Sequence, residues 1–320
     1  MRFFQRKSSG DSDSPVLPAE RTVTSGAVES GAAGATETSR LLDGVRIHYA
    51  TWGAPAPARA TLLIHGLTAS HMAWMALGPA LAADGAYVIA PDLRGRGLSD
   101  KPQHGYSVVI HAAELLALAD ALGLASFQVV GHSLGAVIGM SLAVMASERV
   151  SKLVMVDAGG QIPEDTAQAI GASVARLGAS YPSLDAYLAT MRQLPMFTWN
   201  DTWEAYFRYD AEERPDGTVV SRVPKAAIEE ESLALALTRS EALPALVRAP
   251  TLVVRAPVGL LGPDRGLILP REEAERLKQV MPNCEVIEID GTNHYTVVLS
   301  PVFVEAVQRF LRPESANSSR

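Results

Sequence analysis

Residues 127–135 read Phe-Gln-Val-Val-Gly-His-Ser-Leu-Gly, and this stretch decides the fold class. Its apolar start predicts a buried strand, and the apolar pattern of residues 136–146 predicts a helix directly after it. The G-x-S-x-G pattern therefore stands at a strand–turn–helix junction. Its glycines let strand and helix approach closely, so the turn can project the Ser133 hydroxyl above the sheet. We interpret Ser133 as a nucleophile, next to a Leu134 N–H that can donate to a developing negative charge.

Other short apolar runs resemble the strand before Ser133 and suit a sheet that is covered on both faces. They lie at residues 60–64, 86–90, 153–156, 251–254 and 285–289. Helical patterns alternate with them, at residues 72–82, 111–122, 136–146, 272–280 and 301–311. An Asp43-Gly44 pair between alternating runs predicts a hairpin near the start. The alternation predicts an α/β fold with a mostly parallel central sheet and flanking helices.

The alternation breaks between residues 161 and 246, where helical patterns and aromatic residues replace buried-strand runs. This stretch is predicted to be a helical cap inserted into a core formed by residues 37–160 and 247–315. Residues 1–36 are rich in small and polar residues and predict a disordered tail. Residues 316–320 are expected to be a flexible C-terminus.

Composition excludes several classes of protein. Of 320 residues, 48% are hydrophobic and 20% are charged, which is typical of a globular protein and not of a disordered chain. The net charge of 28 − 35 = −7 disfavours a nucleic-acid binder. No apolar stretch approaches the roughly 20 residues that span a bilayer. Cys284 is the single cysteine, so the chain forms no internal disulfide and its fold does not depend on an oxidising compartment. We therefore expect a cytoplasmic protein. No phosphate-binding loop, dinucleotide fingerprint or metal motif is evident, so no cofactor or metal is expected.

A serine needs an adjacent general base to act as a nucleophile near neutral pH. Of the seven histidines, His294 is the best candidate, because it follows the last predicted strand on a glycine-containing loop. His65 is expected to brace a loop, and His132 to shape the pocket. We expect the remaining four to be a sheet-surface residue, His48, and surface or capping groups, His71, His104 and His111.

Three further segments resemble the α/β-hydrolase fold family in the right order, over about residues 40 to 315. They are Leu63-Ile-His-Gly-Leu67, Pro91-Asp-Leu-Arg-Gly-Arg-Gly-Leu-Ser-Asp100 and Gly291-Thr-Asn-His294. The resemblance implies that the Leu67 N–H is a second oxyanion donor and that His294 is the catalytic histidine. It also implies a structural role for residues 91–100.

Two aspartates are candidates for the carboxylate that orients the histidine. Asp264 lies on the long loop after residues 251–254, the usual position in the family, and we favour it. It stands farther beyond the strand than is typical of the family. Asp157 ends the strand after Ser133, where some branches of the family, including polyketide thioesterase domains, place the acid.

The candidate pocket combines residues of the core loops with aromatic residues of the insertion. It comprises His65, Gly66, His132, Trp74, Trp199 and Trp203. The sequence predicts a cofactor-free serine hydrolase that acts on a small to medium ester, thioester or lactone. Alternatives are a C–C bond hydrolase or an acyltransferase on the same scaffold, or a non-catalytic small-molecule receptor. The oligomeric state stays open.

Overall fold

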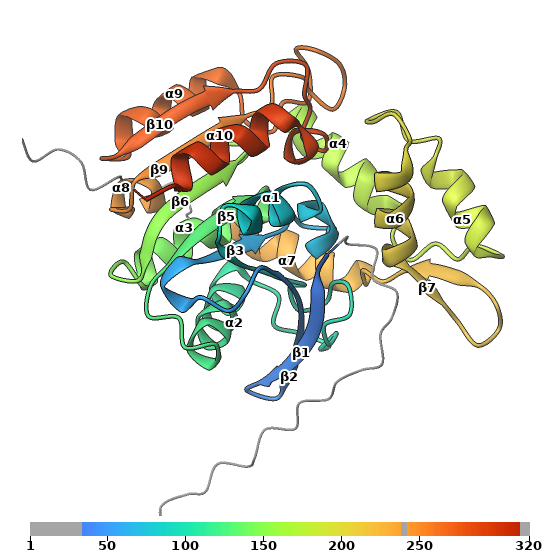
Figure 1. Ribbon diagram of the computed structural model, residues 1–320. Coiled ribbons are helices and arrows are strands. Elements are labelled where there is room, and N and C mark those ends of the chain that lie inside the picture. The colour runs from blue at the N-terminus through green and yellow to red at the C-terminus, as the bar shows by residue number, and fades with distance from the viewer. Residues whose placement is uncertain (1–33, 238–241, 314–320) are drawn as a thin grey trace, which may run out of the picture.

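The computed structural model describes residues 34–237 and 242–313, which are built around an eight-stranded sheet (Figure 1). The strand order is β1-β2-β4-β3-β5-β6-β9-β10; β2 pairs antiparallel with β1 and β4, and the other neighbours are parallel. The strands are β1 Thr36–Leu42, β2 Val45–Trp52, β3 Ala60–Ile64, β4 Tyr87–Pro91, β5 Phe127–His132, β6 Val150–Val156, β9 Thr251–Arg255 and β10 Cys284–Glu288. The predicted α/β fold with a mostly parallel sheet is confirmed.

Helices cover both faces of the sheet, because successive strand residues point to opposite sides. Leu62 packs in the apolar cluster that holds α2, α3 and α9, whereas Leu63 packs in the cluster that holds α1 and α10. The helices of this layer are η1 Pro57–Arg59, η2 His71–Trp74, α1 Leu77–Ala83, α2 Val108–Ala121, α3 Leu134–Met145, α9 Arg271–Val280, η4 Val297–Leu299 and α10 Pro301–Leu311. No helix in the described ranges has the length and apolarity needed to cross a membrane.

The insertion, residues 161–246, lies between β6 and β9 and forms an apolar cluster of its own around Tyr187, Trp203 and Phe207. Its α5 and α6 stand beyond the sheet in Figure 1. It contains α4 Glu164–Ala175, α5 Leu184–Met191, α6 Asp201–Asp210, β7 Ala211–Glu213, β8 Val219–Ser221, α7 Lys225–Leu237 and α8 Leu243–Leu246. The short hairpin of β7 and β8 was not expected, because its three-residue strands are too short to give a buried-strand pattern.

The N-terminal hairpin follows the Asp-Gly prediction. Asp43 and Gly44 have φ values of 46° and 86°, as a tight two-residue turn requires. β1 begins at Thr36, at the end of the stretch predicted to be a tail. The rest of that tail, residues 1–33, and the predicted C-terminal stretch 316–320 lie outside the described residues.

Candidate active site

Ser133 occupies a strained turn between β5 and α3, with φ 56° and ψ −123°. A Cβ atom at Gly131 would lie 2.1 Å from the carbonyl oxygen of Gly135, and one at Gly135 would lie 2.0 Å from that of Ile64. Only glycine fits at these two contacts, so the G-x-S-x-G spacing is a steric requirement of the turn. The Ser133 N–H donates to the Val156 carbonyl at 3.0 Å, which ties the turn to β6.

His294 lies on the loop after β10, and its carboxylate partner is Asp157. Its Nδ1 lies 2.9 Å from Asp157 Oδ2, and both side chains are buried. Asp157 follows β6 directly and is held by a second hydrogen bond, which its Oδ1 accepts from the Ala256 N–H at 3.0 Å. An ionised carboxylate only accepts hydrogen bonds, so the proton in this contact is on His294 Nδ1. In the neutral ring, Nε2 then has the free lone pair.

The favoured alternative, Asp264, is not the carboxylate beside His294. The loop after β9 folds back on itself through hydrogen bonds from the Leu260 N–H to Gly266 and from the Leu261 N–H to Arg265. Asp264 therefore lies exposed in this turn. β6 is the neighbour of both β5 and β9 in the sheet, so its C-terminal end brings Asp157 close to the serine turn.

A cavity of about 870 Å³ opens beside the serine turn, and both Ser133 and His294 line it. Leu67 and Leu134, the predicted oxyanion residues, line it as well. Most of the remaining lining is apolar and comes from the loops of the sheet and from α4, α6 and α7 of the insertion.

Three of the predicted pocket residues line this cavity, namely Gly66, His132 and Trp203. Two tryptophans do not. Trp74 is fully buried in the core between the sheet, α1 and α10, and Trp199 stacks on Phe207 in the apolar cluster of the insertion, with ring centroids 5.6 Å apart. The Trp74 ring is buried in the core, whereas the Trp199 ring is half-buried at the edge of the apolar cluster of the insertion.

His65, which was also predicted to line the pocket, does not line this cavity, because it is fully buried and contacts the backbone of the loop that carries Gly66. Its Nε2 accepts from the Leu93 N–H at 3.0 Å, so its Nδ1 carries the proton and donates to the Gly66 carbonyl at 2.8 Å. Burial lowers the pKa of His65 to about 4, which keeps the ring neutral. The Gly66 carbonyl and the Leu67 N–H belong to one planar peptide, so His65 fixes the direction of that N–H.

His132 supports the loop that carries His294. Its Nε2 donates to the His294 carbonyl at 2.9 Å, and the two rings lie 4.5 Å apart. Burial, followed by the neighbouring His294, holds the pKa of His132 well below its usual value, so this ring is neutral. Its role is to position the loop and shape the cavity wall.

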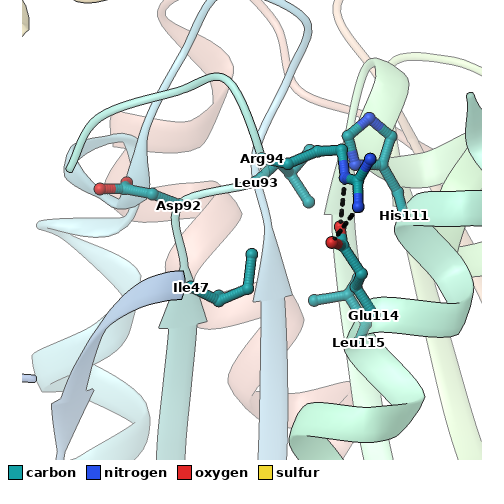
Figure 2. Close-up of a pocket in the computed structure, with 7 residues that line it drawn as sticks. All are labelled: Ile47, Asp92, Leu93, Arg94, His111, Glu114 and Leu115. Carbon is teal, nitrogen blue, oxygen red and sulfur yellow. Dashed lines mark hydrogen bonds and ion pairs between the residues drawn. The ribbon is translucent and has the colours of Figure 1, made fainter. Parts of the chain in front are cut away.

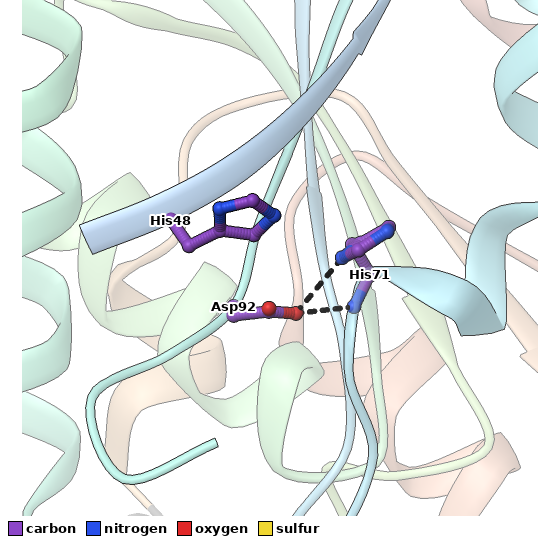
Figure 3. Close-up of side chains that lie close together, drawn as sticks. All are labelled: His48, His71 and Asp92. Atoms are coloured by element: carbon purple, nitrogen blue, oxygen red, sulfur yellow. Dashed lines mark hydrogen bonds and ion pairs between the residues drawn. The ribbon is translucent and has the colours of Figure 1, made fainter. Parts of the chain in front are cut away.

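The sequence did not indicate a second polar cluster, formed by His48, His71 and Asp92, which Figure 3 shows, together with Glu37. His48 and His71 were expected at the surface but are 5% and 0% exposed. Asp92 Oδ1 accepts from the His71 N–H and Nδ1 at 2.8 and 3.1 Å. The aspartate of the Pro91–Asp100 motif was the available signal for this cluster.

His48, His71 and Asp92 are close enough to suggest a metal site. Both oxygens of Asp92 are already engaged, however, since Oδ2 accepts from the Leu98 N–H and from the Tyr209 hydroxyl. Burial alone would raise the pKa of Asp92, but the charge and hydrogen bond of His71 outweigh it and hold that pKa below its usual range. We interpret the cluster as a charged hydrogen-bond network.

His111 was expected at the surface and is also fully buried, 2.8 Å from Glu231 of α7. His104 is exposed, as expected, with its Nδ1 3.2 Å from Glu230. The partners of these histidines come from the insertion, more than a hundred residues away in sequence. Local sequence patterns therefore gave no indication that His111 is buried.

Comparisons with known proteins agree with the observed fold. The family model described as alpha/beta hydrolase fold matches residues 61–301. The chain is 30% identical to N-formylmaleamate deformylase of Pseudomonas putida over 274 residues, which covers 79% of this chain and 87% of that one. It is 27% identical to 2-(acetamidomethylene)succinate hydrolase of Mesorhizobium japonicum, over 78% of this chain and 87% of that one.

A solved structure of E-2-(acetamidomethylene)succinate hydrolase is similar with a TM-score of 0.75 and 22% identity. The similarity covers 87% of this chain and 99% of that one. At this identity the likeness concerns the fold.

Proposed function

Because the chain belongs to the alpha/beta hydrolase fold family, we propose that it is a serine hydrolase that cleaves a small to medium carboxylic ester, thioester or lactone. One observation carries the proposal: Ser133 on its strained turn and the His294–Asp157 pair meet at one cavity. The family membership supports hydrolysis in general, and the serine turn supports an acyl-enzyme route.

In the proposed reaction, the Ser133 hydroxyl oxygen attacks the carbonyl carbon while His294 Nε2 takes its proton. Asp157 holds the imidazole in the required tautomer and stabilises its charged form. The N–H groups of Leu67 and Leu134 donate to the tetrahedral oxyanion. The tetrahedral intermediate then collapses to the acyl-enzyme, which breaks the bond between the carbonyl carbon and the alcohol or thiol, and this leaving group takes the proton from His294. Water then attacks the acyl-enzyme, with His294 again as base, and releases the acid and Ser133.

The size and lining of the cavity favour a substrate with an apolar acyl group. Its volume of about 870 Å³ lies near the upper end of ordinary ligand pockets, which span roughly 300–1,000 Å³. Its walls include Met72, Val137, Met140 and Ile170. Apolar walls of this kind bind a hydrocarbon chain by removing it from water.

The test compares Ser133→Ala with Ser141→Ala, a change at a buried serine of α3, the helix that follows Ser133, outside the cavity. Ser133→Ala is expected to abolish hydrolysis of a p-nitrophenyl ester and labelling by a fluorophosphonate, while Ser141→Ala keeps both. Full esterase activity in Ser133→Ala would exclude the proposal. Ligand binding without turnover in the unaltered protein would favour the receptor alternative.

An amide substrate is the second candidate. The two relatives above are named for N-formyl and acetamido compounds that also carry carboxylates. Arg276 lines the cavity, and although its Nε is paired with Glu273 at 2.9 Å, its guanidinium is a cation in the cavity wall that a substrate carboxylate could approach. Faster hydrolysis of N-formyl or N-acetyl amides of dicarboxylic acids than of matched esters would favour this candidate.

A further inference from the structure

Arg96 is a fully buried arginine that contacts the loop carrying the proposed oxyanion donor Leu67. Its Nε donates to the Leu67 carbonyl at 3.0 Å, its Nη1 donates to the Arg94 carbonyl at 2.9 Å, and its Nη2 binds Glu231. The guanidinium thus joins the oxyanion loop to an ion pair that is fully buried.

Glu231 belongs to α7 of the insertion, so this ion pair crosses from the insertion to the core. Burial alone would raise the pKa of Glu231, but His111 and Arg96 outweigh it and lower that pKa to about 2. The carboxylate is therefore charged at neutral pH and matched by the guanidinium. A buried pair of this kind depends on both partners, because either one alone would be an uncompensated charge.

The core segment that carries Arg96 is fixed by a second ion pair. Figure 2 shows Arg94, two residues before Arg96, paired with Glu114 of α2, and the Arg94 Nη2–Glu114 Oε1 distance is 2.5 Å. The backbone that carries Arg96 is thus anchored independently of the insertion. Movement of α7 would then change the partner of Arg96 rather than the position of its backbone.

Leu67 is the first corner residue of a turn in which the Ala69 N–H donates to the Gly66 carbonyl at 3.2 Å. The peptide before Leu67 is held by His65, and the peptide after it is held by Arg96. These two contacts restrict both backbone torsions of Leu67. The Leu67 side chain also packs against the apolar cluster of Leu177, Val223 and Ile228 in the insertion.

We propose that Arg96 is a positioning residue through which docking of α7, by way of Glu231, sets the Leu67 peptide in its oxyanion-binding orientation. The inference rests on the proposed function of Leu67. In this proposal, docking of the insertion on the core and completion of the oxyanion hole are coupled, because the Leu67 peptide is oriented only when the insertion is docked. An open insertion would bind substrate but stabilise the transition state poorly.

The experiment compares Glu231→Gln with Glu230→Gln. Glu230 is the next residue on α7 and also ties the insertion to the core, since it accepts from the Gly105 and Tyr106 N–H groups at 2.8 and 3.0 Å. Among the described residues, no hydrogen bond or ion pair joins Glu230 to Arg96 or Leu67. The substrate is a short p-nitrophenyl ester, and kcat is expressed per active site, titrated by the burst of p-nitrophenol, so that unfolded protein does not count.

Glu231→Gln is expected to lower kcat about tenfold with little change in KM. This loss is smaller than the roughly 100- to 1,000-fold loss from removing an oxyanion donor, because the Leu67 N–H is misoriented and not removed. The inhibition constant of a trifluoromethyl ketone, which forms the tetrahedral adduct, should weaken in proportion to kcat/KM. Glu230→Gln should keep both parameters within about twofold. A purely structural role would lower the melting temperature and leave kcat per active site unchanged.

A second variant removes both buried charges, Arg96→Met with Glu231→Leu. Apolar replacement of a buried pair commonly preserves the fold, but the donor to Leu67 is lost, so kcat per active site should again fall about tenfold. Unaltered kcat per active site in Glu231→Gln or in this double variant would overturn the inference. Activity that persists in Ser133→Ala would instead overturn the proposed function, so the two failures are distinguishable.

Discussion

Asp157, at the end of β6, lies 2.9 Å from His294, on the loop after β10, although 137 residues separate them in sequence. The carboxylate reaches the imidazole across the end of β9, which lies between the two strands in the sheet. The orientation of the proposed base therefore depends on a residue outside the long loop after β9.

Replacing Asp157 with Asn is expected to lower kcat by about four orders of magnitude, because an amide favours the wrong histidine tautomer. Asp264→Asn, at an exposed position, is the matched control and should stay within about twofold in the same ester assay. A large loss in Asp264→Asn with normal kcat in Asp157→Asn would contradict the assignment.

Gly135→Ala is expected to destabilise the serine turn. The new Cβ would lie 2.0 Å from the Ile64 carbonyl oxygen, and relieving such overlap costs roughly 3 kcal/mol or more. Urea unfolding followed by tryptophan fluorescence measures this change. Gly171→Ala on α4 has no atom within 4 Å of its added Cβ and should not lower the midpoint. Equal midpoints for the two variants would disprove the steric argument.

The buried His71 makes the stability of the fold pH-dependent. Burial alone would lower the pKa of His71, but Asp92 and Glu37 outweigh it and raise that pKa to about 9 from its ordinary value of 6.5. A raised pKa stabilises the fold fully below pH 6.5, and this contribution is lost as the pH rises through about 9.

Urea unfolding between pH 6 and 9.5 should therefore show a decline on the order of 3 kcal/mol in the free energy of unfolding. His71→Gln should be less stable at pH 6 and show a flatter profile. His104→Gln, at an exposed histidine, is expected to follow the unaltered protein. A decline of the same size in His71→Gln would mean that another group causes it.

Ile170→Trp is expected to shorten the acyl chain that the cavity accepts, because Ile170 lines it from α4. Values of kcat/KM for octanoyl esters should fall at least about tenfold, since a clash in an apolar pocket offsets the burial of several methylene groups. Acetyl esters should change little. Gln168→Trp, at an exposed position on the same helix, controls for the added ring, and a parallel loss in both variants would count against the cavity as the acyl site.

The sequence predicted those features that local sterics determine. The glycine spacing around Ser133 requires one kind of turn, and the Asp43-Gly44 pair requires one kind of hairpin, so both predictions agree with the structure. The strands were found because continuous apolar runs are needed where helices cover both faces of a sheet. The mostly parallel sheet followed from their alternation with helices.

Features that depend on distant partners were left open or predicted wrongly from the sequence. Asp157 and Asp264 each follow an interior strand of the sheet, and only the folding of the loop after β9 decides between them. His111 is buried because Glu231 arrives from the insertion, which no spacing in the sequence reveals. Aromatic residues such as Trp199 suit a pocket or a core equally well by composition.

Asp157 lies directly after β6, and the stretch 259–270 of the loop after β9 supplies none of the proposed catalytic groups. It nevertheless contributes Leu260 and Ile268 to the cavity wall. Insertions, deletions and randomised codons in this segment should therefore redirect selectivity while the reaction itself persists. This segment is therefore a suitable target for a library aimed at new substrates.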